Sequence, residues 1–211
     1  VLVSVKINIF ISALKQPLQS IMATHAKTFK ALNSMRRVGE LCDVTLVFDG
    51  ERVPCHKLIL VASGDYFRSM FLGDMAEAKA DEVTIHGIDA PTGRLLVEFL
   101  YSNDISITPG NVGRLLEAAE MLLLPDLKES AEDFLCEIIG PAKCISCLNL
   151  ARMFNAERLL KKAEYYLNSH TSEVVESSGE LDQLKQEDLV RFLQTHGRPE
   201  ESFRLLQKWV R

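Results

Sequence analysis

The spacing of apolar residues changes about midway along this chain, and that change limits the folds it can adopt. In two short segments, residues 42–48 and 82–88, apolar side chains alternate with polar ones, as in strands with one buried face. From residue 95 onward, apolar residues recur every three or four positions, which is the period of amphipathic helices. We therefore expect an α+β domain followed by an all-helical region.

The first of these segments is expected to form a hairpin. It is followed by Asp49-Gly50, a dipeptide that favours a tight turn because both positions tolerate positive φ. Residues 52–55 would be the returning strand, ended by Pro54, which cannot donate a hydrogen bond to the sheet.

Helices are expected on both sides of this hairpin and throughout the second half. Ser63, Thr108 and Asn155 are candidate N-caps, Gly73 is a stop, and Val112 begins a buried stripe. The stripe continues through Leu115, Leu116, Ala119 and Leu122. The helical segments are residues 25–37, 56–62, 141–153, 156–169, 171–177, 185–194 and 199–211, with others before Gly73 and between residues 95 and 139.

Domain limits follow from these patterns. Gly140-Pro141 is the expected boundary, because proline opens a new helix after a glycine stop, giving domains over residues 22–139 and 140–211. The segment 1–21 is expected to be a leader or non-native extension, since it shows strand alternation and contains no clean signal-peptide features.

Composition excludes several functional classes. The net charge is −5, no dense Lys/Arg block occurs, and no eighteen-residue apolar run exists, so neither nucleic-acid binding through a basic face nor a membrane-spanning helix is favoured. With 47% apolar and 25% charged residues the chain is an ordinary globular protein. Its five cysteines are odd in number and scattered, which indicates a reducing compartment.

Nothing in the sequence predicts catalysis, a metal or a cofactor. Motifs for nucleophilic serine, nucleotide phosphates and catalytic zinc are absent. Cys144 and Cys147 have the spacing of half a zinc site, but no second pair completes it. His56 is expected to fix the strand-to-helix turn, and Asp43 to be structural, paired with Lys57 or Arg52. Four carboxylates are expected on solvated helix faces: Glu117, Glu120, Glu129 and Glu132.

Longer stretches resemble a known family. The segments are LCDVTLVFDGERVPCHKLILVASGDYFRSMF, EVTIHGI and LLVEFLYSNDISITPGNVGRLLEAAEMLLLPDLKESAEDFL. Together, over about residues 25–137, they resemble the BTB (POZ) domain of kelch-like proteins. Residues 141–211 look like the BACK domain that follows it, supported by Cys144, by LLKKA at 159–163 and by Trp209-Val210. Two features depart from the pattern of that family. The QTHGRPE connection is short, and the chain ends where that family continues with more helices and a kelch propeller. We therefore expect a truncated BACK-like domain.

The resemblance implies two interaction sites. Met75, Ala76 and Glu77 fit the apolar-x-Glu motif through which this family docks on cullin-3, although the tripeptide alone would equally suit a solvated loop. Phe29, Leu32 and Met35 form a stripe on the first helix, which in BTB proteins packs across a two-fold axis. The alternative is that this stripe covers its own domain. The first BACK helices, about residues 141–169, would extend the cullin surface.

The implied function is that of a non-catalytic adaptor. The chain would homodimerise, bind cullin-3 and bring an unidentified substrate protein to a cullin-RING ubiquitin ligase, with a cytoplasmic and secondarily nuclear location. Two alternatives remain open. One is a BTB self-association scaffold for cytoskeletal or transcriptional partners without cullin binding, and the other is a truncated product that dimerises with full-length paralogues and dampens them.

Overall fold

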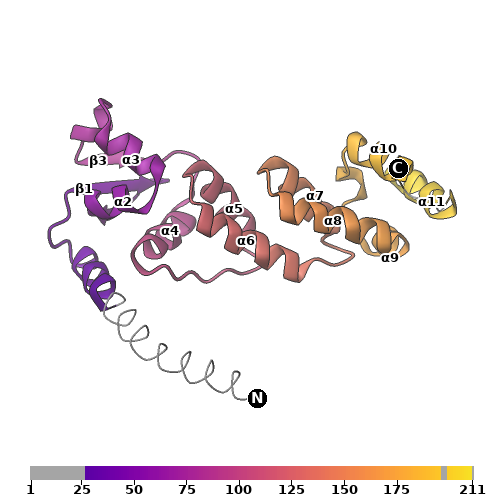
Figure 1. Cartoon of the computed structure of the whole chain (residues 1–211), viewed down its shortest axis with the longest axis horizontal. Helices are drawn as coiled ribbons and strands as arrows, with labels where there is room; N and C mark the ends of the chain where they lie inside the picture. The colour runs from indigo at the N-terminus through magenta and orange to yellow at the C-terminus, as the bar shows by residue number, and fades with distance from the viewer. Residues whose placement is uncertain (1–26, 196–198, 211) are drawn as a thin grey trace, which may run out of the picture. The chain divides into compact units, whose positions relative to one another are not determined.

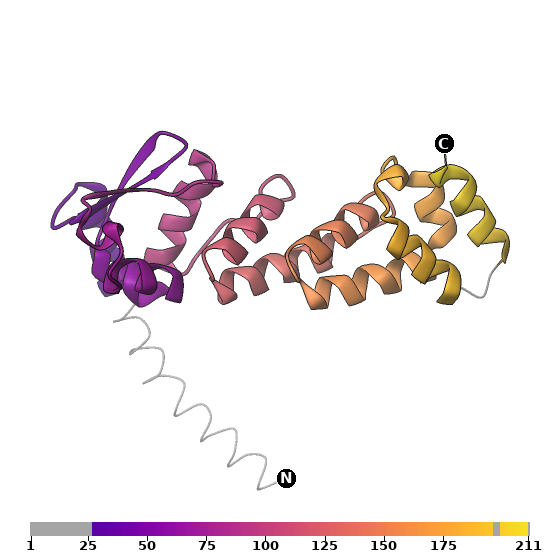
Figure 2. The same ribbon diagram turned by 90° about the horizontal axis from the view of Figure 1, so that it is seen from above.

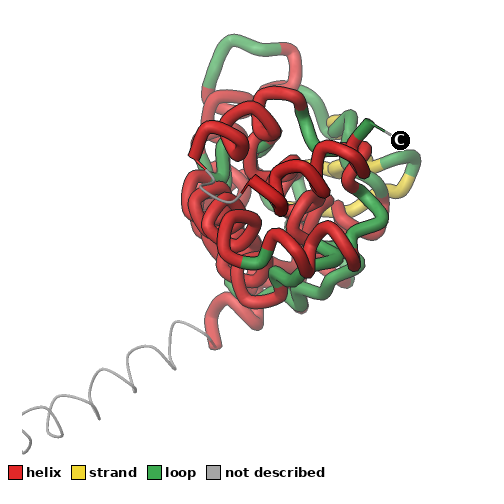
Figure 3. The backbone as a smooth tube through the Cα atoms, turned by 90° about the vertical axis from the view of Figure 1, so that its right-hand side faces the viewer, coloured by secondary structure: helices red, strands yellow, loops and turns green. Residues whose placement is uncertain are grey.

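The computed structural model describes residues 27–195 and 199–210, and the chain divides into two compact units, Val1–Ser106 and Ile107–Arg211 (Figure 1). The expected leader over residues 1–21 lies outside the described residues. Each unit has its own set of elements, and the described strands, drawn yellow in Figure 3, all belong to the first unit.

A three-stranded sheet forms the first unit's β part. The strands are β1 (Val44–Phe48), β2 (Glu51–Cys55) and β3 (Glu82–Thr84), in the order β2-β1-β3. Strands β1 and β2 pair antiparallel, with Val44 opposite Cys55 and Phe48 opposite Glu51, whereas β3 is parallel to β1. Figure 2 shows the ribbon from above, with the strands in its indigo to purple part.

The predicted hairpin turn is confirmed. Asp49 has a φ of 46° and Gly50 a φ of 83°, as the tight turn requires. Pro54 lies within β2 rather than ending it, opposite Thr45. The sheet tolerates it because β2 is an edge strand, so a missing N–H need not leave a neighbouring strand unpaired.

Helices surround this sheet in the first unit. A helix over residues 27–37 precedes β1, and α2 (Lys57–Ser63), α3 (Asp65–Leu72), the 3₁₀ turn η1 (Ala76–Lys79) and α4 (Ala90–Ser102) follow. Leu46, Phe48, Leu60, Phe67 and Leu96 are fully buried and form much of the core.

The second unit is entirely helical over its described residues. Its elements are α5 (Val112–Met121), α6 (Pro125–Ile138), α7 (Cys144–Met153), α8 (Glu157–Ser169), α9 (Thr171–Ser177), the 3₁₀ turn η2 (Leu181–Gln183), α10 (Gln186–Thr195) and α11 (Pro199–Trp209). An α+β part followed by helices is the expected fold class, which is confirmed. The predicted stripe of α5 is buried throughout.

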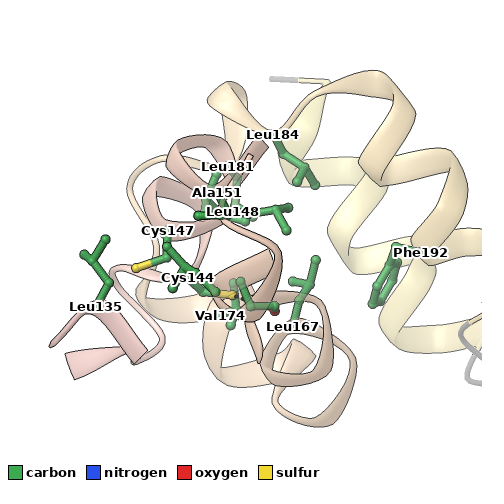
Figure 4. Close-up of a cluster of buried hydrophobic side chains, with 14 of the residues drawn as sticks. Leu135, Cys144, Cys147, Leu148, Ala151, Leu167, Val174, Leu181, Leu184 and Phe192 are labelled. Atoms are coloured by element: carbon green, nitrogen blue, oxygen red, sulfur yellow. Dashed lines mark hydrogen bonds between the residues drawn. The ribbon is translucent and has the colours of Figure 1, made fainter. Parts of the chain in front are cut away.

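Helices α5 and α6 share a core with the helices that follow them. Leu116 and Leu135 belong to the same buried cluster as Cys144, Leu148 and Phe192, part of which Figure 4 shows. The second compact unit therefore begins at Ile107. The division into domains at residues 139 and 140 stays a prediction.

Three predicted helix caps are wrong. Ser63 Oγ donates back to Ile59 O at 2.7 Å, and Gly64 is the N-cap of α3. Helix α5 begins at Val112 after Asn111, because Thr108 closes a turn onto Asn111 instead. Asn155 adopts a left-handed conformation in the α7–α8 connection, which leaves Ala156 as the N-cap of α8.

One carboxylate expected on a solvated face is buried. Glu132 is only 7% exposed, because α6 packs against both α5 and α8 and thus buries more than one face. Glu117 and Glu129 are exposed as expected, and the partly exposed Glu120 accepts from Lys128 Nζ at 2.6 Å. Within the described residues, no helix has the length and apolarity that crossing a bilayer requires.

Candidate functional site

The segment after α3 presents the first candidate site. Helix α3 ends at Gly73, where an added Cβ would lie 2.7 Å from Ser69 O, so a side chain there would collide with the preceding turn. The chain then extends through Met75 and tightens into η1. Met75 is 53% exposed, Ala76 is exposed and Glu77 is half-buried. The three predicted docking residues thus lie together on one short loop with the apolar side chain in solvent.

This loop is anchored to the helices behind it. Lys57 Nζ, from α2, donates to Ala78 O at 3.1 Å and lies 5.5 Å from the centre of the Phe71 ring in α3. One ammonium group therefore joins η1 to both helices, by a hydrogen bond and a cation–π contact. The loop presents Met75 from a fixed backbone.

Charge and apolar surface both occur around this loop. Burial raises the pKa of the Tyr66 phenol, and the nearby negative charge of Glu77 raises it further. Two more apolar side chains, Leu58 of α2 and Leu72 of α3, are strongly exposed. Helix α3 contacts η1, and α2 contacts α3. Sequence reasoning missed Leu58 and Leu72. Leu58 could have been found, because it falls outside the buried face formed by Ile59 and Leu60.

The first helix presents the second candidate site. Phe29 is 44% exposed, and Leu32 and Met35 are half-buried. The most buried side chains of this helix are instead polar: Asn33 and Arg36. The apolar stripe is therefore not the main contact of this helix with its own domain.

A polar network attaches the helix to α4. Asn33 Nδ2 donates to Glu98 Oε2 at 2.7 Å, Arg36 Nη2 donates to Glu98 Oε1, and Arg37 Nη2 donates to Glu98 Oε2 at 2.8 Å. Burial of Glu98 opposes ionisation, yet the hydrogen bonds from Arg37 and Asn33 and the charge of Arg36 together lower its pKa. Glu98 was not singled out from the sequence, because a lone glutamate in a helix carries no signal of such a role.

His56 and Asp43 have structural roles, as expected. His56 is buried between Tyr101 and the backbone carbonyl of Glu40. Asp43 Oδ1 accepts from the Lys57 backbone N–H at 2.7 Å, so it binds the first turn of α2 rather than the ammonium of Lys57. Arg52 pairs with Glu82 instead of Asp43.

The cysteines of α7 face the core. Cys144 and Cys147 are buried, and burial raises the pKa of their thiols to about 12 and about 11. No group of three or more potential metal ligands occurs in the described part of the chain.

Comparison with known families accounts for this arrangement. The model of the BTB/POZ domain matches residues 32–139, just over half of the 211 residues. The chain belongs to the BTB/POZ domain family. The matched residues include the sheet, the η1 loop and the α4 anchor of the first helix.

Relatives of this BTB chain are kelch-like proteins. Kelch-like protein 2 of Mus musculus and of Rattus norvegicus are each 38% identical over 149 residues, which is 71% of this chain and 25% of theirs. The protein of that name from Homo sapiens is 37% identical over the same length and shares. The predicted kelch-like resemblance is confirmed. The chain spans a quarter of the length of these relatives.

The BTB domain of zebrafish PATZ1 is a similar solved structure, with 28% sequence identity and a TM-score of 0.48, covering 53% of this chain and 91% of that one. BTB and kelch-like proteins are generally non-catalytic adaptors. The roles of residues 75–77 and of the first-helix stripe stay predictions.

Proposed function

We propose that this chain is a homodimeric BTB adaptor that binds cullin-3 and brings a substrate, held by another module, to a cullin-RING ubiquitin ligase. The proposed cullin contact is Met75-Ala76-Glu77, and the proposed dimer contact is the first-helix stripe of Phe29, Leu32 and Met35. We place this adaptor in the cytoplasm, with the nucleus as a second location.

The observation that carries the cullin proposal is the exposure of Met75 on an anchored loop. An isolated methionine in solvent gains nothing for its own domain, since its apolar area stays in water. A flexible thioether fills irregular apolar grooves well, and the neighbouring Glu77 carboxylate offers a charge-assisted hydrogen bond. Because Lys57 holds the loop, little ordering cost would remain for binding.

Dimerisation is supported by the polarity of the first helix. Its polar face is buried against Glu98 while its apolar face is partly exposed, the reverse of a helix that only covers its own core. A second copy placing the same stripe across a two-fold axis would bury both stripes at once.

The proposed mechanism is proximity rather than chemistry. A bound adaptor would place a substrate lysine near ubiquitin carried by the ligase and so raise its effective concentration. A dimer would carry two cullin arms. No side chain of this chain would need to take part in ubiquitin transfer.

Calorimetric titration with the cullin-3 N-terminal domain tests the docking loop. We expect one cullin per protomer, and at least tenfold weaker binding for Met75→Asp, because a central apolar anchor is worth about 1.4 kcal/mol or more. Phe203→Asp, which changes a comparably exposed apolar residue of α11, is the matched control and should bind normally. Binding unaffected by Met75→Asp would refute the loop assignment, and a folded sample that releases no heat would refute the adaptor and leave the scaffold.

Sedimentation equilibrium tests the dimer. Phe29→Asp should shift the protein toward monomer, because a carboxylate would be buried across the two-fold axis. Ala31→Asp adds the same charge to an exposed position of the same helix and is the control. A wild-type monomer at micromolar concentration, or equal effects of the two variants, would contradict the proposed interface.

A further inference from the structure

A small cavity lies between α7, α8 and α10 in the second unit. Its volume is about 140 Å³, and its apolar lining is Leu148, Leu167 and Phe192, which Figure 4 shows. Three polar side chains also line it: Glu164, Asn168 and Asp188. A space of this size holds several waters or one small organic group.

Asp188 is the unusual member of this lining. It is only 4% exposed, yet its Oδ2 atom has neither a hydrogen-bond nor an ion-pair partner among the described residues. The guanidinium of Arg152 forms an ion pair with Asp188, but the same Nη2 also donates to Glu164 Oε1 at 2.9 Å. One positive charge is thus shared between two carboxylates.

The other cation near the cavity, Arg191, is the more exposed of the two. Arg191 Nη1 donates to the same Glu164 Oε1 at 2.9 Å, and its side chain is 57% exposed. Water screens a charge at such a position far more than it screens Asp188. Two guanidinium groups thus pair with two carboxylates at this cavity, and the better buried guanidinium, that of Arg152, is the one shared between them.

Asn168 adds a second acceptor without a partner. Its amide nitrogen, Nδ2, donates to the backbone carbonyl of Glu164 at 2.9 Å. Its amide oxygen, Oδ1, has no hydrogen-bond partner among the described residues. The unpartnered polar atoms on the lining residues are then Asn168 Oδ1 and Asp188 Oδ2, and both are acceptors. Leaving buried acceptors unpaired is costly, so a donor should fill the space.

We propose that this cavity is a binding site for a guanidinium or primary ammonium group on a short aliphatic stem. The cationic head would donate to Asp188 and Asn168, and the stem would lie against Leu167 and Phe192. An anion would bring acceptors to acceptors and is rejected. The head could belong to a free small amine or to an arginine or lysine side chain of a partner protein. The site shares no residue with the proposed cullin contact at residues 75–77.

Ligand-observed NMR titration on the full chain tests this site with agmatine, which carries a guanidinium on a four-carbon stem. N-butylurea, a neutral donor of similar shape, is the ligand control and should bind at least tenfold more weakly. Acetyl-Gly-Arg-Gly-amide distinguishes the source of the head. Binding at least as tight as that of agmatine assigns the site to a protein side chain, and binding of agmatine alone assigns it to a small molecule.

Two variants locate the binding. Asp188→Asn removes the buried charge at constant shape and should weaken agmatine at least tenfold, whereas Glu187→Gln, an exposed carboxylate in the same turn of α10, should leave it unchanged. Because Asp188→Asn also disturbs Arg152, Leu167→Phe provides a second variant that fills the cavity without altering its charges. Equal effects of Asp188→Asn and Glu187→Gln, or unchanged binding in a folded Leu167→Phe protein, would overturn the proposal. Absence of agmatine binding to the wild type, a cavity that holds water only, would overturn it too.

Discussion

The Tyr101 hydroxyl lies 2.8 Å from both the backbone nitrogen and the Nδ1 atom of His56, so one phenol oxygen forms two hydrogen bonds with this histidine. It accepts from the backbone N–H, and it donates to Nδ1 when the ring carries its proton on Nε2, which faces Glu40 O at 2.9 Å. These bonds connect the end of β2, the start of α2 and the last turn of α4. Burial raises the pKa of Tyr101, which keeps the donor proton in place.

Replacing Tyr101 with phenylalanine should therefore destabilise the chain. The Tyr101→Phe change leaves the His56 N–H buried without a partner, at a cost of about 1–3 kcal/mol in the free energy of unfolding. Urea denaturation measures this cost. Tyr165→Phe, on an exposed tyrosine of α8, should change stability by less than about 0.5 kcal/mol. Similar costs for the two variants would show that the hydroxyl of Tyr101 is not needed.

Glu98 should make the attachment of the first helix sensitive to acid. Its pKa is lowered in the folded chain, so its contribution to stability is present above the unfolded value, about 4.3, and is lost as pH falls through the folded pKa. We expect Glu98→Gln to speed amide hydrogen exchange in residues 27–37 at pH 7. Between pH 5 and pH 3 the variant should lose less stability than the wild type. Glu51→Gln, which breaks the surface pair with Arg94, is the control and should leave exchange in the first helix unchanged.

Element types could be predicted from sequence because periodicity reflects which faces are buried. Alternation around Val44 and Leu46 identified β1, and the stripe through Leu115 and Leu116 identified α5, since each reports one buried face. The turn at Asp49-Gly50 was predictable for a local reason, the positive φ of both residues.

Residues whose roles depend on distant partners could not be predicted in this way. Glu132 is buried because α6 meets two helices, and no local pattern records the second contact. Glu98 is important because Asn33 and Arg36, more than sixty residues away, reach it. Ser63 illustrates the same limit at short range, since a serine can bond either to the next helix or back to the preceding turn.

The buried thiol of Cys144 should make the free energy of unfolding fall as pH rises above 9. Burial raises its pKa from 9.0 to about 12, so between these values the unfolded chain releases a proton that the folded chain retains. Stability from this group is complete below pH 9 and falls by about 1.4 kcal/mol per pH unit above it. Cys144→Ala should therefore flatten the decline of the free energy of unfolding between pH 9 and pH 10.5. Cys42→Ala, on a half-exposed cysteine, should flatten it less, and equal slopes in all three proteins would contradict this account.

The close approach of α4 to the sheet depends on Gly93. An added Cβ there would lie 2.2 Å from Cγ of Phe48, a buried residue of β1 that has little room to move. Alanine in a helix interior normally stabilises by about 1 kcal/mol relative to glycine, so the sign of the change separates propensity from packing. We expect Gly93→Ala to destabilise by about 1–3 kcal/mol, because overpacking exceeds the helical gain.

Gly113 provides the matched control for this prediction. It lies in α5, and its added Cβ would be 3.9 Å from Leu150, an ordinary contact, so Gly113→Ala should stabilise the chain by about 1 kcal/mol. If contact with Phe48 causes the loss, Phe48→Leu should cost less in the Gly93→Ala background than in the wild type. A double-mutant cycle by urea denaturation measures this coupling, and strictly additive effects would place the role of Gly93 elsewhere.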